Sequence, residues 1–146
     1  MDSFKDKVVI VTGAGGGLGR AHALEFARRG AKVVVNDLGS SADGSGASDM
    51  ADQVVDDIRK AGGVAIANKA SVSDRTSAKT IVDDAVSEFG TVDILVNNAG
   101  ILRDKSFKNM SLDDWDLVMN VHLNGTAYVT HAAWPAMYAK NYGRIL

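Results

Sequence analysis

Short apolar runs alternate with segments of helical periodicity along the chain. The apolar runs are rich in β-branched residues and end in turn residues, which predicts strands near 7–12, 32–36, 64–67 and 92–96. Other segments repeat apolar residues at the spacing of one helical face, which predicts helices near 17–29, 50–61, 75–88 and 112–139. Strands that alternate with helices are typical of βαβ units, so we expect an α/β fold with a doubly wound parallel sheet.

The chain is expected to form one domain. Its 146 residues can bury one sizeable core, and we assign residues 1–146 to a single, incomplete domain. The polar stretch 39–48 is too short for an interdomain linker and predicts a mobile loop or a short insertion. At the end, Gly143 to Leu146 resembles a turn into a fifth strand, and we predict that so short a strand cannot contribute to a sheet. We therefore expect the fold to be truncated at the start of the fifth strand, as the N-terminal part of a longer chain.

Composition narrows the possible partners. The net charge is −2 and no basic cluster occurs, which gives nucleic-acid binding no support. The chain has no cysteine, and no apolar run is long enough to span a membrane. The N-terminus is too charged for a secretory signal, so we expect a cytoplasmic protein, or a peroxisomal one if a longer chain carries that address. His22, His122 and His131 lie on different turns without a second ligand at metal spacing, so we predict helix-surface or interface residues and no metal site.

A glycine-rich turn is the strongest candidate for a binding site. The stretch Thr12–Gly19 follows the apolar run Val8–Val11 and precedes a helical pattern. A strand, a glycine turn and a helix N-terminus direct several backbone N–H groups to one spot, where an anion such as pyrophosphate binds. The spacing is Gly-x-x-x-Gly-x-Gly, which differs from the commoner dinucleotide fingerprint. The turn therefore predicts a phosphate cradle at the carboxyl end of the first strand.

Asp37 adds a second candidate at the end of the next strand. In dinucleotide-binding folds an acidic side chain in this place accepts hydrogen bonds from the adenosine ribose. The same carboxylate repels a 2′-phosphate, and no Arg or Lys lies within 14–16 or directly after Asp37 to reverse that preference. We therefore predict NAD rather than NADP as the cofactor. The alternative is that Asp37 only caps the loop that follows it.

Four motifs in order resemble the short-chain dehydrogenase/reductase family over the whole chain. They are the glycine turn, Asp37, the run Asn97-Asn98-Ala99-Gly100, and Asn120 in the long fourth helix. The resemblance implies a Rossmann-type sheet. Within the family, the segments 100–107 and 121–125 are similar to one branch, the (3R)-hydroxyacyl-CoA dehydrogenase domain of type 2 multifunctional β-oxidation enzymes and its bacterial relatives.

The resemblance also implies roles for individual residues at the cofactor. The pyrophosphate would be approached by Gly13, Gly17, Leu18 and Gly19. Adenine would lie near Ser71 and Val72, where many members have an Asp and Ser71 offers only a hydroxyl or its backbone. The nicotinamide-side ribose would be lined by Asn98, Ala99 and Gly100, while Asn97 would tie the fourth strand to its neighbours. The alternative for the two asparagines is a polar turn after a strand.

The catalytic half of the family's site is missing from these residues. The family uses a Ser after the fifth strand and a Tyr-x-x-x-Lys motif, and Tyr128, Tyr138 and Tyr142 are not followed by Lys at that spacing. Asn120 matches the family's Asn that binds a water in the proton relay. The alternative is a polar position on an amphipathic helix. Asn120 is thus a supporting catalytic candidate only.

Three functions remain open from the sequence. The first is the NAD-binding part of an oxidoreductase that transfers hydride between NAD and a small-molecule secondary alcohol or ketone, with a 3-hydroxyacyl-CoA as the implied substrate; this chain alone should be inactive. The second is a non-catalytic nucleotide-binding module, and the third is a fragment without autonomous function. The family pairs through its long fourth helix and the one after it, which implies a homo-oligomer in the full-length form. The fourth helix places on one predicted face Trp115, Val118, Val121, Tyr128, Val129 and Ala132.

Overall fold

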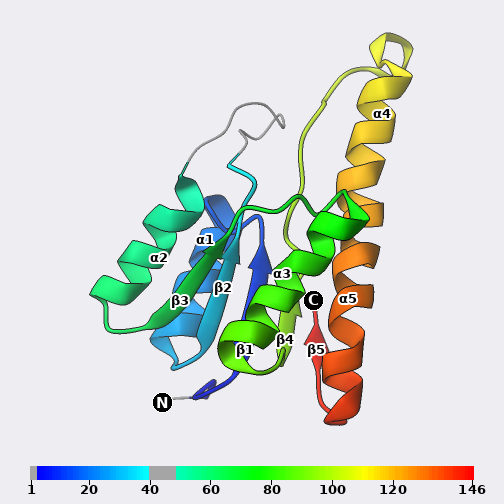
Figure 1. The fold of residues 1–146 in the computed structure, drawn as a ribbon. Helices are drawn as coiled ribbons and strands as arrows, with labels where there is room; N and C mark the ends of the chain where they lie inside the picture. The colour runs from blue at the N-terminus through cyan, green and yellow to red at the C-terminus, as the bar shows by residue number, and fades with distance from the viewer. Residues whose placement is uncertain (1–2, 40–48) are drawn as a thin grey trace.

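Five parallel strands form one twisted sheet in the computed structural model, which describes residues 3–39 and 49–146 (Figure 1). The strands are β1 (Val8–Thr12), β2 (Lys32–Asn36), β3 (Val64–Asn68), β4 (Ile94–Val96) and β5 (Arg144–Ile145). Their order in the sheet is β3-β2-β1-β4-β5. This order confirms the predicted Rossmann-type topology. The predicted loop lies outside the described residues except for Gly39.

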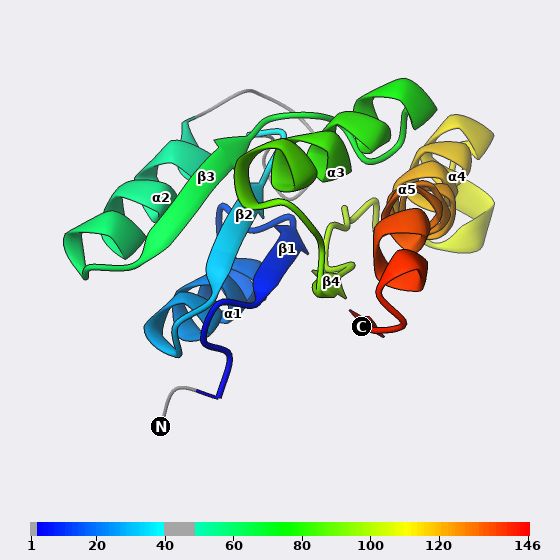
Figure 2. The same cartoon turned by 60° about the horizontal axis from the view of Figure 1, so that its bottom comes forward.

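Helices cover both faces of the sheet, as a doubly wound fold requires. One face carries α1 (Gly17–Arg28) and α2 (Met50–Lys60). The other carries α3 (Arg75–Phe89) and α5 (Gly125–Ala139), as Figure 2 shows. A further helix, α4 (Leu112–Met119), extends beyond the carboxyl ends of the strands, after a short 3₁₀ turn, η1 (Phe107–Asn109). Within the described residues, no helix combines the length and apolarity needed to cross a membrane.

The two faces explain why β1 and β2 consist almost entirely of apolar residues. Side chains alternate across a strand, so Val9 and Val11 pack beneath α1 and α2 while Val8 and Ile10 pack beneath α3 and α5. All four are 0–1% exposed. A strand that is buried on both faces needs an unbroken apolar run, because neither set of side chains meets water. Each such burial contributes about 1.5–3 kcal/mol to folding before entropy is counted.

The predicted helix over 112–139 contains a change of helix type. Between α4 and α5 the backbone forms a π-helical turn, η2 (Asn120–Asn124). Pro135 lies inside α5, and the helix continues past it to Ala139. Buried Val129, Ala133 and Met137 anchor α5 on the sheet on both sides of the proline and offset its missing N–H.

The six residues predicted to share one face of this helix differ in how far they are buried. Val129 is fully buried against the sheet, whereas Trp115 is 47% exposed. Val121, Tyr128 and Ala132 lie at the margin of the core, packed against it. Val118 is likewise partly buried. Trp115 is more exposed because α4 extends beyond the carboxyl ends of the strands (Figure 1).

The prediction that the last residues cannot join the sheet was wrong. Arg144 pairs with Ile94 and Ile145 with Leu95 in parallel register. The Arg144 N–H donates to the Asp93 carbonyl at 3.0 Å, and the Leu146 N–H donates to the Leu95 carbonyl at 2.9 Å. Two residues suffice here because the preceding segment is already anchored at Lys140, so that pairing orders few additional residues.

That anchor is an ion pair at the amino ends of the strands. The Lys140 Nζ donates to the Thr91 hydroxyl, the Val92 carbonyl and Asp93 Oδ1 at 2.6–2.7 Å. Asp93 Oδ2 accepts a hydrogen bond from the Val8 N–H at 2.8 Å. Burial alone raises the pKa of Asp93, but Lys140 and the Val8 N–H lower it more, and the pKa stands below its ordinary 3.8. This contribution to stability is therefore full above pH 3.8 and is lost as the pH falls through the folded-state pKa.

Replacing Lys140 by Ala should lower the free energy of unfolding by about 2–3 kcal/mol, because the buried carboxylate of Asp93 loses its partner. Denaturant unfolding followed by circular dichroism measures the change. Lys79→Ala is the matched control, since Lys79 forms an ion pair with Asp83 on the exposed surface of α3. That change should cost less than about 1 kcal/mol. Equal losses of unfolding free energy in the two variants would contradict the role of Lys140 as the partner that stabilises the Asp93 carboxylate.

Candidate functional site

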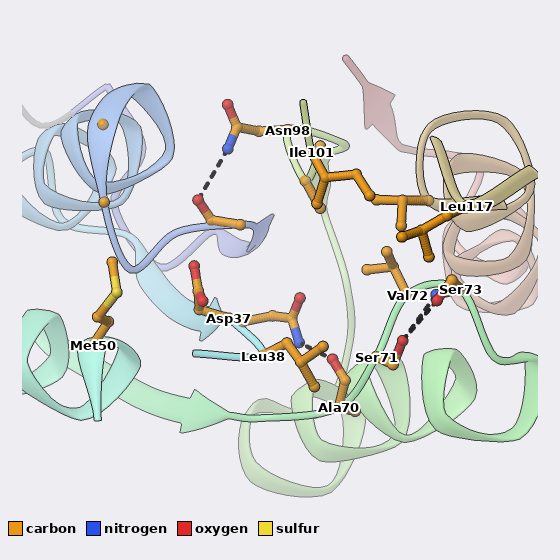
Figure 3. Close-up of a pocket in the computed structure, with 17 residues that line it drawn as sticks. Asp37, Leu38, Met50, Ala70, Ser71, Val72, Ser73, Asn98, Ile101 and Leu117 are labelled. Atoms are coloured by element: carbon orange, nitrogen blue, oxygen red, sulfur yellow. Dashed lines mark hydrogen bonds between the residues drawn. The ribbon is translucent and has the colours of Figure 1, made fainter. Parts of the chain in front are cut away.

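A cleft of about 440 Å³ opens at the carboxyl ends of the strands. It lies where the chain order reverses between β1 and β4, the point at which open α/β sheets bind their ligands. Six segments contribute to it: the glycine turn, the ends of β2 and β4, the start of α2, the loop after β3, and the helical region of α4 and the π-helical turn (Figure 3). The residues that line it are Gly13, Gly16, Gly17, Asn36, Asp37, Leu38, Met50, Ala70, Ser71, Val72, Ser73, Asn98, Ala99, Gly100, Ile101, Leu117 and Val121.

The glycine turn leaves room for a ligand because its glycines have no side chains. Gly13 has a φ of +62° and Gly17 a φ of +51°, which L-residues with a Cβ rarely adopt. A Cβ on Gly13 would lie 2.8 Å from the Ala99 Cα, and a Cβ on Gly19 would collide with the Gly13 carbonyl oxygen. Helix α1 begins at Gly17 with no acidic residue in its first turn. Its free N–H groups and its dipole therefore favour an anion at this end of the cleft.

Thr12 and Asn98 join the glycine turn to the end of β4. The Thr12 hydroxyl accepts from the Asn98 and Ala99 N–H groups at 3.1 and 3.0 Å and donates to the Val96 carbonyl at 3.3 Å. The Asn98 side-chain amide donates to the Thr12 and Gly13 carbonyls, both at 3.0 Å. Thr12 is 1% exposed. These bonds fix the two edges of the cleft relative to each other.

The two asparagines that follow β4, Asn97 and Asn98, contact different parts of the molecule. Asn97 was expected to tie β4 to its neighbours, and its N–H donates to the Leu146 carbonyl while its side chain donates to the Thr130 hydroxyl. Asn98 binds the glycine turn and also lines the cleft. The amide nitrogen of Asn98 is occupied by its two carbonyl partners. Its side-chain oxygen is the part that remains for a ligand hydroxyl.

Among the described residues that line the cleft, Asp37 is the one that carries a charge. Its Oδ2 accepts from the Gly15 N–H at 2.8 Å and its Oδ1 accepts from the Gly39 N–H at 2.7 Å. A carboxylate has about four acceptor sites, so two backbone partners leave capacity for ligand hydroxyls. Met50 packs beside it, with its Cβ 2.7 Å from where a Cβ on Gly15 would lie. Asp37 thus orients the glycine turn while it faces the cleft.

The loop after β3 is held by a network of polar side chains. Asn36 donates to Asn68 Oδ1 and to the Ala70 carbonyl, both at 2.9 Å. Asn68 in turn donates to Asp84 on α3 at 2.7 Å. Further along, the hydroxyls of Ser71 and Ser73 lie 2.9 Å apart (Figure 3). The Ser71 hydroxyl is therefore engaged within its own loop.

Asn120 begins the π-helical turn and braces the same loop. Its side-chain amide donates to the Ser73 carbonyl at 3.2 Å, and its Oδ1 accepts from Asn124 at 3.0 Å. The residue is partly buried and does not line the cleft. It therefore makes specific tertiary contacts, unlike a polar residue on an exposed helix face.

Most predicted cofactor residues meet at this cleft. Gly13, Gly17, Asp37, Ser71, Val72, Asn98, Ala99 and Gly100 all line it. Two do not: Leu18 is 73% exposed, and Gly19 is buried beneath the turn against the Gly13 carbonyl. Their backbone places them at the start of α1, next to the lining residues.

The sequence analysis missed the apolar part of the lining. Leu38 and Ile101 directly follow predicted residues, so their neighbours in sequence are a signal that was available. Met50, Leu117 and Val121 come from helices, and no local pattern indicates that these helices reach the cleft. The contact of His122 with the cleft wall was also not predicted: its Nε2 lies 3.0 Å from both the N and the O of Ile101.

The family model described as "short chain dehydrogenase" matches residues 7–146. With the parallel sheet and the glycine turn described above, the chain belongs to the short-chain dehydrogenase family.

Relatives with known names are similar over nearly the full chain. Peroxisomal multifunctional enzyme A of Dictyostelium discoideum is 59% identical over 99% of this chain. Hydroxyacyl-CoA dehydrogenase ChsB1 of Mycobacterium tuberculosis is 47% identical over 87% of it. The chain spans 32% and 39% of these two proteins, respectively. A 7α-hydroxysteroid dehydrogenase solved in complex with NADH and 7-oxo glycochenodeoxycholic acid superposes with a TM-score of 0.87 at 34% identity, over 99% of this chain and 54% of that one.

Replacing Gly19 by Ala should lower the free energy of unfolding by about 3 kcal/mol, because the new Cβ meets backbone atoms that cannot move aside. Gly17→Ala is the matched control: no atom lies within 4 Å of its Cβ, so only its positive φ is strained. That strain costs about 1 kcal/mol. Chemical denaturation of both variants measures the difference, and a smaller cost at Gly19 than at Gly17 would refute the packing argument.

Proposed function

We propose that these residues form the dinucleotide-binding part of an oxidoreductase that transfers hydride between NAD and a secondary alcohol or ketone. The observation that carries this proposal is the pairing of an open glycine turn at the N-terminus of α1 with the carboxylate of Asp37, which lines the same cleft. Family membership and a structural neighbour in complex with NADH support it. When bound, the nicotinamide ring supplies a carbon that accepts or donates the hydride.

Each part of a dinucleotide can be assigned to a group of residues at the cleft. Backbone N–H groups at Gly13, Gly17, Leu18 and Gly19 would hold the pyrophosphate. Asp37 would accept from the adenosine ribose through its remaining acceptor sites. Adenine would pack near Ser71 and Val72, where backbone atoms are the available partners because the Ser71 hydroxyl bonds to Ser73. Asn98, Ala99 and Gly100 would line the nicotinamide half.

We propose NAD rather than NADP. Within residues 3–39 and 49–146, Asp37 is the only charged residue that lines the cleft, so no cation in this part of the lining would offset its repulsion of a 2′-phosphate. Met50 adds an apolar wall beside the carboxylate. Repulsion between the Asp37 carboxylate and the 2′-phosphate, without a cation to offset it, is a sufficient basis for discriminating against NADP.

For the chemical step, this chain supplies positioning and binding. The reaction also needs a group that takes the alcohol proton as the hydride leaves, and the family's Ser and Tyr-x-x-x-Lys are absent from these residues. Asn120 would support such a relay from the π-helical turn, where it is already held by Ser73. A second candidate is a nucleotide-binding module without turnover, since the residues that line the cleft are assigned to binding.

The proposed substrate class is a 3-hydroxyacyl-CoA. Its support is the similarity of segments 100–107 and 121–125 to that branch of the family and the named hydroxyacyl-CoA dehydrogenase among the relatives. A homo-oligomer of the full-length protein is proposed on the same family basis.

Asp37→Ala should weaken NAD binding by about 1–3 kcal/mol, the range for leaving buried polar groups unpaired. Isothermal titration calorimetry of the 146-residue chain measures it, with exposed Asp56→Ala on α2 as the matched control. The unchanged chain should bind NADP more weakly than NAD. Equal affinities for NAD and NADP would contradict the role of Asp37.

The purified chain should not reduce NAD with a 3-hydroxyacyl-CoA, because it lacks the residues that accept the proton. Absorbance of NADH at saturating substrate measures turnover, and binding of NAD in the same preparation is the control. Turnover by this chain would overturn the assignment of these residues to binding alone.

A further inference from the structure

We propose that His122 is a positioning residue that holds the Gly100–Ile101 segment in the conformation that receives the nicotinamide half of the cofactor. The proposal rests on the function proposed above and names a residue for which neither the motifs nor the comparisons provide a role. His122 was predicted as a helix-surface or interface residue. It is exposed on the helix, and its side chain also contacts Ile101 in the wall of the cleft.

The contact is specific in both hydrogen bonding and shape. The His122 Nε2 lies 3.0 Å from the Ile101 N and 3.0 Å from the Ile101 O, so the imidazole reaches both polar groups of one residue. A Cβ on Gly100 would lie 2.6 Å from the His122 Cε1 and 3.0 Å from its Nε2. The ring therefore occupies the space that a side chain at residue 100 would need. Gly100 and Ile101 both line the cleft.

The π-helical turn lets one short segment reach two walls of the cleft. Asn120 binds the Ser73 carbonyl in the loop after β3, while His122 binds Ile101 in the loop after β4. Residues two apart on a helix point in different directions, so a single turn can brace both loops. π-helical turns occur frequently at functional sites. The placement of this one makes His122 the brace of the nicotinamide side.

The imidazole can keep its contact in either tautomer. With its proton on Nδ1, Nε2 accepts from the Ile101 N–H; with its proton on Nε2, it donates to the Ile101 carbonyl. A glutamine amide can likewise donate to the carbonyl or accept from the N–H. His122→Gln should therefore preserve the brace, whereas His122→Ala removes it.

Calorimetry with two ligands separates this role from a general loss of structure. On the proposed function NADH would occupy both ends of the cleft, whereas AMP carries only the part proposed to bind at the Asp37 end. His122→Ala should weaken NADH binding about 2- to 10-fold, the factor expected from one hydrogen bond, and leave AMP binding unchanged. His122→Gln should recover at least half of the loss in NADH affinity, compared as logarithms of the dissociation constants. His22→Ala, at an exposed position on α1, is the matched control and should change neither.

The outcomes distinguish this proposal from the one on which it rests. Equal loss of NADH and AMP affinity in His122→Ala, or unchanged NADH affinity, overturns the positioning role while the proposed function stands. An unchanged chain that binds neither NADH nor AMP overturns the proposed function and this inference together.

A second variant tests the steric half of the contact. Gly100→Ala places a methyl group against the His122 ring and should weaken NADH binding without affecting AMP. Adding His122→Ala removes that clash, so the double variant should bind NADH no more weakly than His122→Ala alone. Additive losses in the double-mutant cycle would show that the two residues act independently and would overturn the proposal.

Discussion

The hydroxyl of Thr12 is the contact on which the organisation of the cleft depends. It accepts two backbone N–H groups after β4 and donates to the Val96 carbonyl, at a place with almost no exposure to water. The loops at the carboxyl ends of two parallel strands have no ladder partners, and buried polar groups must be satisfied by other means. Thr12 and Asn98 provide these partners. The glycine turn and the Asn98–Ala99 segment take their relative positions from this cross-link.

Several residues around the cleft combine structural and binding roles. Asp37 holds Gly15 through one oxygen and Gly39 through the other, and the same carboxylate faces the cavity. Asn98 uses its amide nitrogen for the glycine turn and leaves its oxygen for a ligand. Such sharing arises because the cleft walls are loops, whose shape has to be fixed by the side chains within reach. A side chain that shapes the site is then already preorganised to bind in it.

The sequence predicted what depends on local pattern and missed what depends on the assembled fold. Four strands and the helices α1 to α3 follow from periodicity, since burial on one or both faces imposes it directly. The glycine turn and Asp37 were recognisable because the chemistry of phosphate and ribose binding restricts residue type. β5 was misjudged because its stability comes from Lys140 and not from its own length. The contact between His122 and Ile101 was not predictable, because a π-helical turn has no periodic signature and the two segments meet only in the folded chain.

The ion pair of Asp93 and Lys140 lies at the amino ends of the strands, whereas the cleft lies at their carboxyl ends. β1 connects the two, since its first residue, Val8, bonds to Asp93 and its last, Thr12, bonds to the cleft. Substitutions at distant, independent sites have additive effects on stability. The residues that line the cleft can therefore diverge during evolution, and ligand preference can change with them. Selection for a folded protein acts meanwhile at the opposite edge of the sheet.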